Sequence, residues 1–256
     1  MTAPLILAAG SMLDVDAFEL VDAAADAGFD GVGLRLSGPH AVADLALLRQ
    51  HAAGRGIRIA DVEVHRITAG THADDAVALI AGAAELGAAA VLVVSDLADD
   101  AATVAQLAAL AERCRAHGLR LGLEYMAWTN PCEPTAAVKM AQIAGCELVV
   151  DLLHHVRIGA GVVELDAIVA AGVLGWVQVC DAVPVIAPMD HAALLHEARH
   201  TRLLPGEGTL PLRDLLRQVP VDTVISVEVQ SDQLLCTPPR ERAQLLHDSA
   251  RRVLAG

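Results

Sequence analysis

Four short segments in the second half of the chain each carry a side chain that could bind a metal ion through oxygen. LGLE ends at Glu124, LVVD ends at Asp151, WVQVCD carries Gln178 and ISVEV carries Glu228. Carboxylate and amide oxygens suit a hard divalent ion such as Mn²⁺ or Mg²⁺ better than a thiolate zinc site. Three carboxylates that converged without a cation would repel one another. We interpret the four residues as metal ligands, the alternative being polar residues that simply end strands.

These side chains can meet only if the segments are neighbouring strands. Eight short runs rich in leucine and β-branched residues predict strands: Leu5–Ala8, Gly31–Leu36, Ile57–Val64, Ala90–Ser95, Leu119–Glu124, Leu148–Asp151, Trp176–Cys180 and Val224–Val229. Alanine- and leucine-rich stretches between them predict helices, such as Asp14–Ala27, Ala98–His117 and Arg240–Leu254. The eight strand segments are continuously apolar, which predicts that helices cover the strands on the outside.

Eight alternations of strand and helix predict a (β/α)8 TIM barrel that forms a single domain over residues 1–256. A doubly wound open sheet is the alternative. In such a barrel the chemistry lies at the C-terminal ends of the strands, where the four oxygen donors stand. The longest irregular stretch, Asp181–Thr209, follows the seventh strand and is a candidate for the walls of the active site or a lid.

Composition excludes several classes of function. The chain has 256 residues and a net charge of −14, a field that repels nucleic acid and anionic membrane surfaces. Aromatic residues make up only 2%, too few for a platform on which single-stranded bases stack. The single lysine, Lys139, lies within a helix-like segment, which argues against Schiff-base and P-loop chemistry. We expect a small-molecule substrate and no nucleic-acid or membrane partner, and we leave a homo-oligomer open.

The five cysteines indicate a reducing compartment. Their number is odd and none form a CxxC pair, so a disulfide framework or a zinc finger is not expected. The N-terminal segment MTAPLILAAGS has no basic region and makes a poor signal peptide. Residues Ala76–Val94 contain Glu85 and Gly87, which favours a helix followed by a buried strand over a membrane span. These features predict a cytoplasmic protein.

An ordered set of segments resembles the xylose isomerase-like TIM-barrel superfamily, also called the sugar phosphate isomerase/epimerase family. The set covers the second half of the chain, and the first half matches only in GFDGVGLRL (28–36). No single motif is decisive, but the order and spacing are fairly specific. The segments are LEYMAWTNP (123–131), VVDLLHHVRIG (149–159), VQVCDA (177–182), RLLPGEGTLPL (202–212) and ISVEV (225–229).

The resemblance implies one divalent metal ion, Mn, Mg, Co or Zn, at Glu124, Asp151, Gln178 and Glu228. It also implies that Glu124 and Glu228 act as acid and base on opposite faces of the substrate. Gln178 stands where many epimerases have histidine, and glutamine at that place is similar to barrel dehydratases that act on 3-dehydroshikimate. This departure leaves the type of reaction open.

Five further residues are candidates for substrate binding. The resemblance favours His154, in the pattern D-x-x-H, as a substrate contact. Arg157 could bind a hydroxyl, carboxylate or phosphate group, or form a salt bridge at the rim. Trp128 follows Glu124 and could form an apolar wall against a ring. The second and third strands end near Arg35 and His65, which could also line the rim.

The leading prediction is a metal-dependent isomerase or epimerase of a small keto-sugar or polyol derivative, with a place in carbohydrate metabolism and manganese as a suitable ion. It would abstract a proton next to a metal-bound carbonyl and form an enediolate. The alternative is a metal-dependent dehydratase of the 3-dehydroshikimate or inosose type. Cleavage of phosphodiesters, as in related abasic-site endonucleases, is opposed by the negative charge. A non-catalytic barrel is opposed by the intact ligand set.

Overall fold

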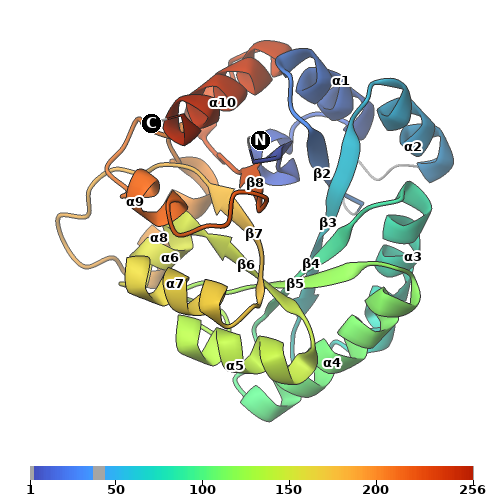
Figure 1. The fold of residues 1–256 in the computed structure, drawn as a ribbon, viewed down its shortest axis with the longest axis vertical. Coiled ribbons are helices and arrows are strands. Elements are labelled where there is room, and N and C mark those ends of the chain that lie inside the picture. Colours follow the sequence, from blue (N-terminus) through green and yellow to red (C-terminus); the bar gives the residue numbers. More distant parts are fainter. Residues whose placement is uncertain (1–2, 37–43, 256) are drawn as a thin grey trace.

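Eight parallel strands follow one another around a closed barrel, and β8 pairs with β1 to complete it (Figure 1). The computed structural model describes residues 3–36 and 44–255. The predicted single-domain (β/α)8 barrel is confirmed, and the open sheet is excluded. The strands are β1 (Leu5–Leu7), β2 (Gly31–Arg35), β3 (Arg58–Ile67), β4 (Ala90–Ser95), β5 (Arg120–Glu124), β6 (Glu147–Asp151), β7 (Leu174–Val179) and β8 (Val224–Val227).

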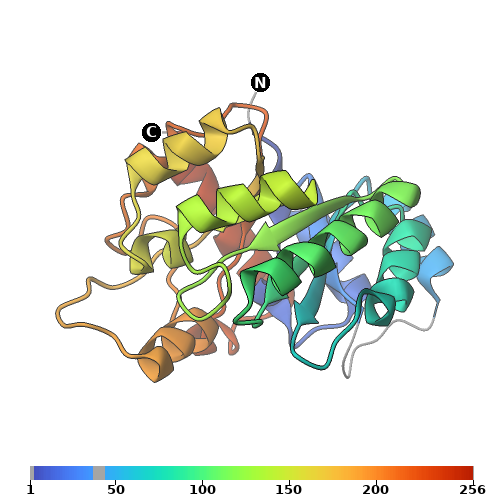
Figure 2. The same ribbon diagram turned by 90° about the horizontal axis from the view of Figure 1, so that it is seen from below.

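Helices surround the barrel and cover the outer face of its strands (Figures 1 and 2). The α-helices are α1 (Ala17–Ala27), α2 (Leu45–Gly54), α3 (Val77–Leu86), α4 (Asp100–Ala116), α5 (Pro134–Ala144), α6 (Leu152–Arg157), α7 (Val162–Ala170), α8 (His191–His200), α9 (Leu212–Leu216) and α10 (Pro239–Leu254). The described residues also form the short 3₁₀ helices η1 (Ala9–Met12), η2 (Ala73–Ala76) and η3 (Asp232–Leu234).

The helix ends follow local side-chain chemistry. Asp16 accepts the N–H groups of Phe18 and Glu19 at the start of α1, and Gly28 ends that helix with a φ of 88°. An aspartate cap satisfies N–H groups that have no partner within the helix, and a glycine takes the left-handed conformation at little cost. Asp99 caps α4 in the same way. The sequence therefore predicts these helices to within two or three residues.

Two helices in the connections do not follow from the sequence analysis. The stretch Asp181–Thr209 is predicted to be irregular, but it contains helix α8, and the segment between β7 and α8 projects from the barrel (Figure 2). The residues directly after Asp151 form α6. Both helices are short and rich in histidine, so their apolar periodicity is weak.

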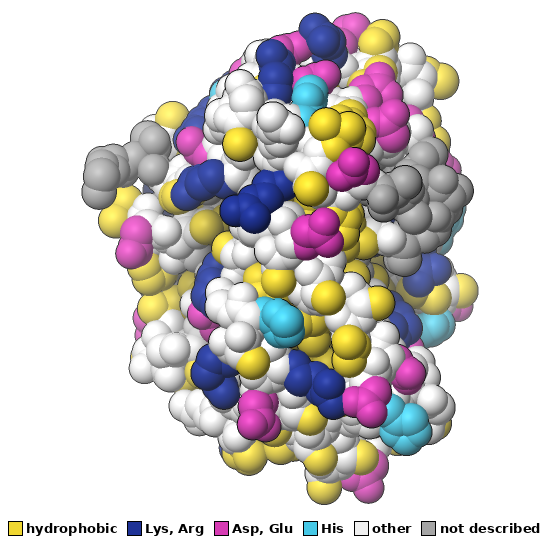
Figure 3. Space-filling model, turned by 90° about the vertical axis from the view of Figure 1, so that its right-hand side faces the viewer, with side chains coloured by type: hydrophobic (Ala, Val, Ile, Leu, Met, Phe, Trp, Pro, Cys, Tyr) yellow, Lys and Arg dark blue, Asp and Glu magenta, His cyan; other side chains and the backbone are white. Residues whose placement is uncertain are grey.

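Charge is spread over the outside of the barrel. On the face shown in Figure 3, basic and acidic side chains are interspersed, so the net charge of −14 does not gather there into one patch. None of the helices that the structure describes is both long and apolar enough to cross a membrane.

The interior of the barrel is packed around one large side chain. Trp176 of β7 belongs to an inner cluster with Leu92, Val149 and their neighbours, separate from the core between strands and helices. Gly122 of β5 gives the indole its space: a Cβ there would lie 2.2 Å from Trp176 Cη2. Real side chains do not approach so closely, because interiors are already close-packed.

We expect Gly122→Ala to destabilise the barrel, because neither Trp176 nor Val149 has room to move. The free energy of unfolding should fall by about 1–3 kcal/mol, as for other overpacked cores. Gly54→Ala is the control, since a Cβ at that helix position meets no atom within 4 Å. Urea denaturation of both variants measures the difference, and equal stability of the two would contradict the packing described.

Candidate active site

A cavity of about 290 Å³ opens among residues at the C-terminal ends of the strands. Its lining combines acidic with basic side chains. The charged and aromatic residues that line it are Glu63, Glu124 and Glu228, Arg35, Arg66, Arg199 and Arg202, and His154 and Trp128. The cavity can therefore take a small polar molecule with a negative charge.

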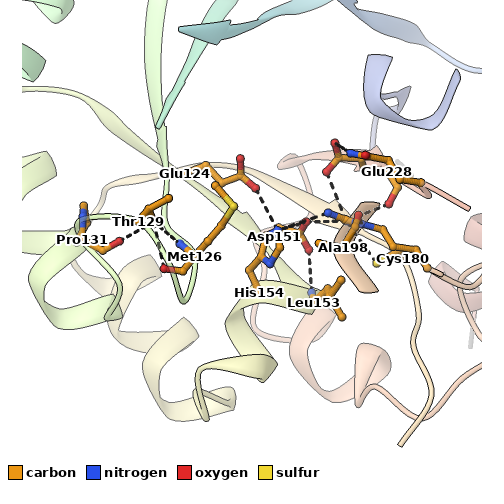
Figure 4. Close-up of polar contacts among 12 residues, drawn as sticks. Glu124, Met126, Thr129, Pro131, Asp151, Leu153, His154, Cys180, Ala198 and Glu228 are labelled. Atoms are coloured by element: carbon orange, nitrogen blue, oxygen red, sulfur yellow. Dashed lines mark hydrogen bonds and ion pairs between the residues drawn. The ribbon is translucent and has the colours of Figure 1, made fainter. Parts of the chain in front are cut away.

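Glu124, Asp151 and His154 converge at one point beside this cavity. Glu124 ends β5, and Asp151 ends β6 and caps α6 by accepting the N–H of Leu153 at 2.8 Å. The helix turn then brings His154 Nε2 within 3.6 Å of Asp151 Oδ2 and 3.9 Å of Glu124 Oε1. One ligand atom from each of the three lies within 4.8 Å of the others, and all three side chains are buried (Figure 4).

A buried guanidinium joins these acids to Glu228. Arg202 Nη1 donates to Asp151 Oδ2 at 2.7 Å and lies 3.4 Å from Glu228 Oε2. Arg202 also donates to the carbonyl oxygens of Ala198 and Glu228, at 2.7 and 3.2 Å. A buried charge is stable only with such partners. Nearby acids hold the pKa of Arg202 above its usual range despite burial, so it stays charged.

Asp181 holds the segment that carries Arg202. Its carboxylate accepts the N–H groups of Gly206 and Leu210, at 3.0 and 2.9 Å, and its backbone pairs with Leu203 in both directions. A Cβ at Gly208 would lie 2.4 Å from the Asp181 carboxylate, so the turn approaches closely only because glycine stands there. The turn after α8 is thereby fixed to the end of β7.

Glu228 follows β8 and is fixed by the first turn of the chain. Ser11 Oγ donates to the Val227 carbonyl oxygen at 2.9 Å and accepts the Val229 N–H at 2.8 Å, so η1 clasps the backbone on both sides of Glu228. A Cβ at Gly10 would lie 2.2 Å from Glu228 Oε1. Only glycine at position 10 therefore leaves room for the carboxylate.

Gln178 lies at the level of Asp151, its partner in the register of β6 and β7. Trp176, two residues earlier, points into the barrel, and strand alternation puts Gln178 on the same face. Its side-chain oxygen is buried and has no hydrogen-bond partner in the described part of the chain. An orphaned oxygen at this depth is what a metal ligand without its ion would look like.

The acids differ in how easily they ionise. Burial, with Glu228 and Asp151 nearby, raises the pKa of Glu124 well above its ordinary value. Burial also raises the pKa of Glu228, although Arg202 opposes it. For Asp151, burial acts in the same direction, but Arg202 and His154 outweigh it and its pKa lies below the usual range. Burial lowers the pKa of His154 to about 4, so its imidazole is neutral at pH 7.

Two more buried acids stand on β3 below these groups. Burial and then Glu228 raise the pKa of Glu63 to about 8 and that of Asp61 to about 7. Arg35 Nη2 lies 3.2 Å from Glu63 Oε1, but without the alignment of a hydrogen bond. The Asp61 carboxyl makes no hydrogen bond to any residue that the structure describes.

The predicted substrate residues fall into two groups. Arg35, Trp128 and His154 line the cavity, and the Trp128 ring stands edge-on to His154 with centroids 5.0 Å apart. His65 and Arg157 do not line it. His65 is half-buried on β3, and Arg157 binds both carboxylate oxygens of Glu197, at 2.6 and 2.7 Å, as the predicted rim salt bridge would.

The donor set fits a divalent cation. Glu124 and Asp151 offer hard carboxylate oxygens, Gln178 offers an orphaned one, and His154 adds a neutral imidazole nitrogen. Asp151 already accepts one hydrogen bond at each oxygen, yet each oxygen keeps a free lone pair. A positive ion would also relieve the repulsion that raises the pKa of Glu124.

Several residues of the site escaped the sequence analysis. Arg202 and Gly10 lie 51 and 218 positions from the side chains they meet, so no local pattern connects them. Arg66 and Arg199 are exposed enough to pass for ordinary surface charges. Glu63 does not end a predicted strand. A carboxylate within an apolar run nevertheless indicates that the interior of the barrel is polar at this point.

Comparison with known proteins places the chain among barrels of this kind. The sequence profile of xylose isomerase-like TIM barrels matches residues 21–253. A 3-dehydroshikimate dehydratase of Pseudomonas aeruginosa is 33% identical over 174 residues, which cover 62% of this chain and 26% of that protein. The chain therefore spans about a quarter of the length of this relative.

Solved structures agree on the fold. A fusion of a xylose isomerase-like TIM barrel with 4-hydroxyphenylpyruvate dioxygenase matches 98% of this chain and 42% of its own, with a TM-score of 0.83 and 25% identity. The match to the IolI protein with a bound zinc atom covers 100% of this chain and 98% of IolI, with a TM-score of 0.83 and 14% identity. D-psicose 3-epimerase, solved in the presence of D-fructose, matches 100% of both chains, with a TM-score of 0.68 and 14% identity.

We expect Gln178→Leu to weaken binding of Mn²⁺, because it removes an oxygen donor and keeps the size of the side chain. The loss should be about tenfold or more, measured by calorimetry on protein stripped of metal. Gln178→His should instead keep binding and shift preference toward Co²⁺ and Zn²⁺, since imidazole is the softer ligand. Unchanged Mn²⁺ affinity in Gln178→Leu would remove Gln178 from the ligand set.

Stability should depend on pH through Asp61. Because its pKa is about 7 in the folded chain and 3.8 ordinarily, the folded state alone holds the proton between these values. The free energy of unfolding therefore falls as pH rises through this window, by about 1.4 kcal/mol per unit. Asp61→Asn removes this loss. The melting temperature of the variant, measured in the presence of a chelator, should therefore rise relative to that of the wild type as the pH is raised from 4 to 8. Asp166→Asn, at an exposed carboxylate of α7, should show no such trend.

Proposed function

We propose an activity for this chain, which belongs to the xylose isomerase-like TIM barrel family: removal of a proton from the carbon next to a carbonyl group in a small, negatively charged hydroxy-ketone, followed by loss of a hydroxyl group as water. The observation that carries the proposal is one cavity that combines buried glutamates, able to move a proton, with guanidinium groups at its wall and mouth. The dehydratase relative supports the second half of the reaction.

The arginines support a substrate with a carboxylate. Arg199 is exposed at the mouth and pairs with no carboxylate among the described residues, whereas Arg66 donates to Asp96 at 2.7 Å. Arg35 keeps a buried Nε without a partner. Guanidinium groups bind carboxylates through paired hydrogen bonds, and a neutral sugar would leave Arg199 without such a partner. Trp128 supplies an apolar wall for a ring.

The metal site we propose comprises Glu124, Asp151, Gln178 and Glu228. His154 can join it, because one ligand atom each of Glu124, Asp151 and His154 lies within 4.8 Å of the others. A divalent ion there would polarise the carbonyl and acidify the neighbouring C–H group. Mn²⁺ and Mg²⁺ suit the oxygen donors, and His154 would admit Co²⁺ or Zn²⁺.

Glu228 is the base that we assign to the first step. The Arg202 guanidinium lies 3.4 Å from its carboxylate and favours the ionised form. The carboxylate takes the proton from carbon, and the electron pair of the C–H bond forms a carbon–carbon double bond. The hydroxyl group on the next carbon leaves with its bonding electrons and takes up a proton to become water. Glu124 and His154, 3.9 Å apart, are placed to deliver that proton.

The second candidate is the isomerase or epimerase of a keto-sugar or polyol. One feature favours it: β5 and β8 are three strands apart around the barrel, so Glu124 and Glu228 stand on different sides of the cavity. In Figure 4 they lie on either side of Asp151. One glutamate could then remove a proton from one face of a carbon while the other returns a proton to the opposite face.

The test is to incubate the metal-loaded protein in deuterated water with 3-dehydroshikimate and, separately, with D-fructose or D-psicose. A dehydratase should accumulate a conjugated product with new ultraviolet absorbance from the first. An epimerase should return deuterium to carbon in the second, which NMR detects. Activity on neither substrate class, with metal occupancy near one, would reject both candidates.

Glu124→Gln and Glu228→Gln keep an oxygen donor but remove the carboxylate. We expect the rate of the observed reaction to fall by about 10²–10⁴-fold in each variant, while metal content changes far less. Glu207→Gln, at an exposed carboxylate on the turn after Arg202, is the matched control and should react as the wild type does. Wild-type rates in both test variants would show that the two glutamates do not move the proton.

A further inference from the structure

A second cavity, of about 400 Å³, lies at the opposite end of the barrel. It opens between α2 and the end of α3 and reaches the first residues of β3, β5 and β8. None of the residues that line it also lines the catalytic cavity. Small side chains leave the space, since α2 presents Ala52 and Ala53 and the connection to β4 contributes Gly87 and Ala89.

Two buried polar groups in this cavity lack partners. The Asp61 side chain is 6% exposed and makes no hydrogen bond to a described residue. Trp176, 3% exposed, has an indole N–H that is likewise unpaired. Buried polar groups nearly always have a hydrogen-bond partner. A bound molecule with a hydroxyl group could donate to the Asp61 carboxylate, which lines the cavity.

The mouth of the cavity is positively charged. Arg49 and Arg58 line it and are exposed, and neither pairs with a carboxylate in the described part of the chain. Their contacts are weak ones to carbonyl oxygens, at 3.4 Å for Glu85 and 3.5 Å for Asp30. Arg120 adds a third guanidinium, 5.9 Å from the centre of the Trp176 ring, although it also pairs with Glu147. Three cationic groups favour an anion over a cation at this mouth.

We propose that this second cavity binds a small cyclic carboxylate that carries a hydroxyl group at its far end. The carboxylate lies between Arg49 and Arg58 at the mouth, as paired guanidinium groups favour. The ring packs against Ile57, Ile59 and Leu86, which line the wall. The hydroxyl group reaches Asp61.

Protonation of Asp61 suits this ligand. Burial raises the pKa of Asp61 to about 7, which favours the neutral form of its carboxyl group. A neutral carboxyl group neither repels the anion nor needs a cation beside it, and it donates as well as accepts hydrogen bonds. The proposed binding site shares no lining residue with the candidate active site. We therefore expect the ligand to bind there without a metal ion.

Fluorescence of Trp176 provides the test. The chain has only two tryptophans, so Trp128→Phe leaves Trp176 as the sole reporter. Three probes of one shape are titrated at pH 6.5 in the presence of a chelator: trans-4-hydroxycyclohexanecarboxylate, the corresponding amide and the corresponding aminomethyl compound. We expect saturable binding of the carboxylate, at least tenfold weaker binding of the amide, and none of the amine. Cyclohexanecarboxylate, without the hydroxyl group, should bind more weakly than the hydroxy acid.

Matched variants test in which of the two cavities the ligand binds. The double variant Arg49→Gln/Arg58→Gln should weaken binding of the hydroxy acid about tenfold, equivalent to roughly 1.4 kcal/mol, and Asp61→Ala should abolish its advantage over cyclohexanecarboxylate. Arg199→Gln, at the mouth of the catalytic cavity, should leave binding unchanged. The exposed arginines can be replaced without loss of the fold, which melting curves verify. Absence of saturable binding, equal binding of the amine, or weakening by Arg199→Gln instead would each overturn the proposal.

Discussion

The end of the barrel that carries the candidate active site depends on one buried charge. Arg202 lies among Asp151, Glu228 and two backbone carbonyl oxygens, where its guanidinium holds together acids that would otherwise repel one another. The cost of burying such a group is met only when every partner is in place. The turn fixed by Asp181 and the register of β6 therefore have little freedom to shift. The same contacts hold the side chains of the candidate active site in fixed positions.

The strands differ in whether their buried side chains are acidic or apolar, and this difference decides where polar groups lie inside the barrel. Asp61 and Glu63 on β3, with Glu228 beyond β8, form a polar half of the interior, whereas Trp176 and its neighbours fill the other half with apolar surface. Trp176 lines the second cavity, which shares no lining residue with the candidate active site.

The sequence predicts the framework well because strands in such a barrel are continuously apolar and helices cap with aspartate and end with glycine. Glu124, Asp151 and Glu228 could be found because each ends or follows a strand, and all such ends meet on one face. Arg202 could not be found in that way, since its partner Asp151 is 51 residues distant and a turn, not a strand, carries it. The position of α8 was missed because its polar residues give little periodicity.

The clasp between η1 and the backbone around Glu228 has a consequence for biosynthesis. Ser11 and Gly10 emerge first from the ribosome, and their partners Val227 and Glu228 emerge more than 200 residues later. Until β8 arrives, β1 and the most recent strand both have unpaired edges, which are prone to associate with other chains. The proposed base receives its place in the same event that closes the sheet. A nascent or truncated chain without β8 therefore lacks the contacts that position Glu228.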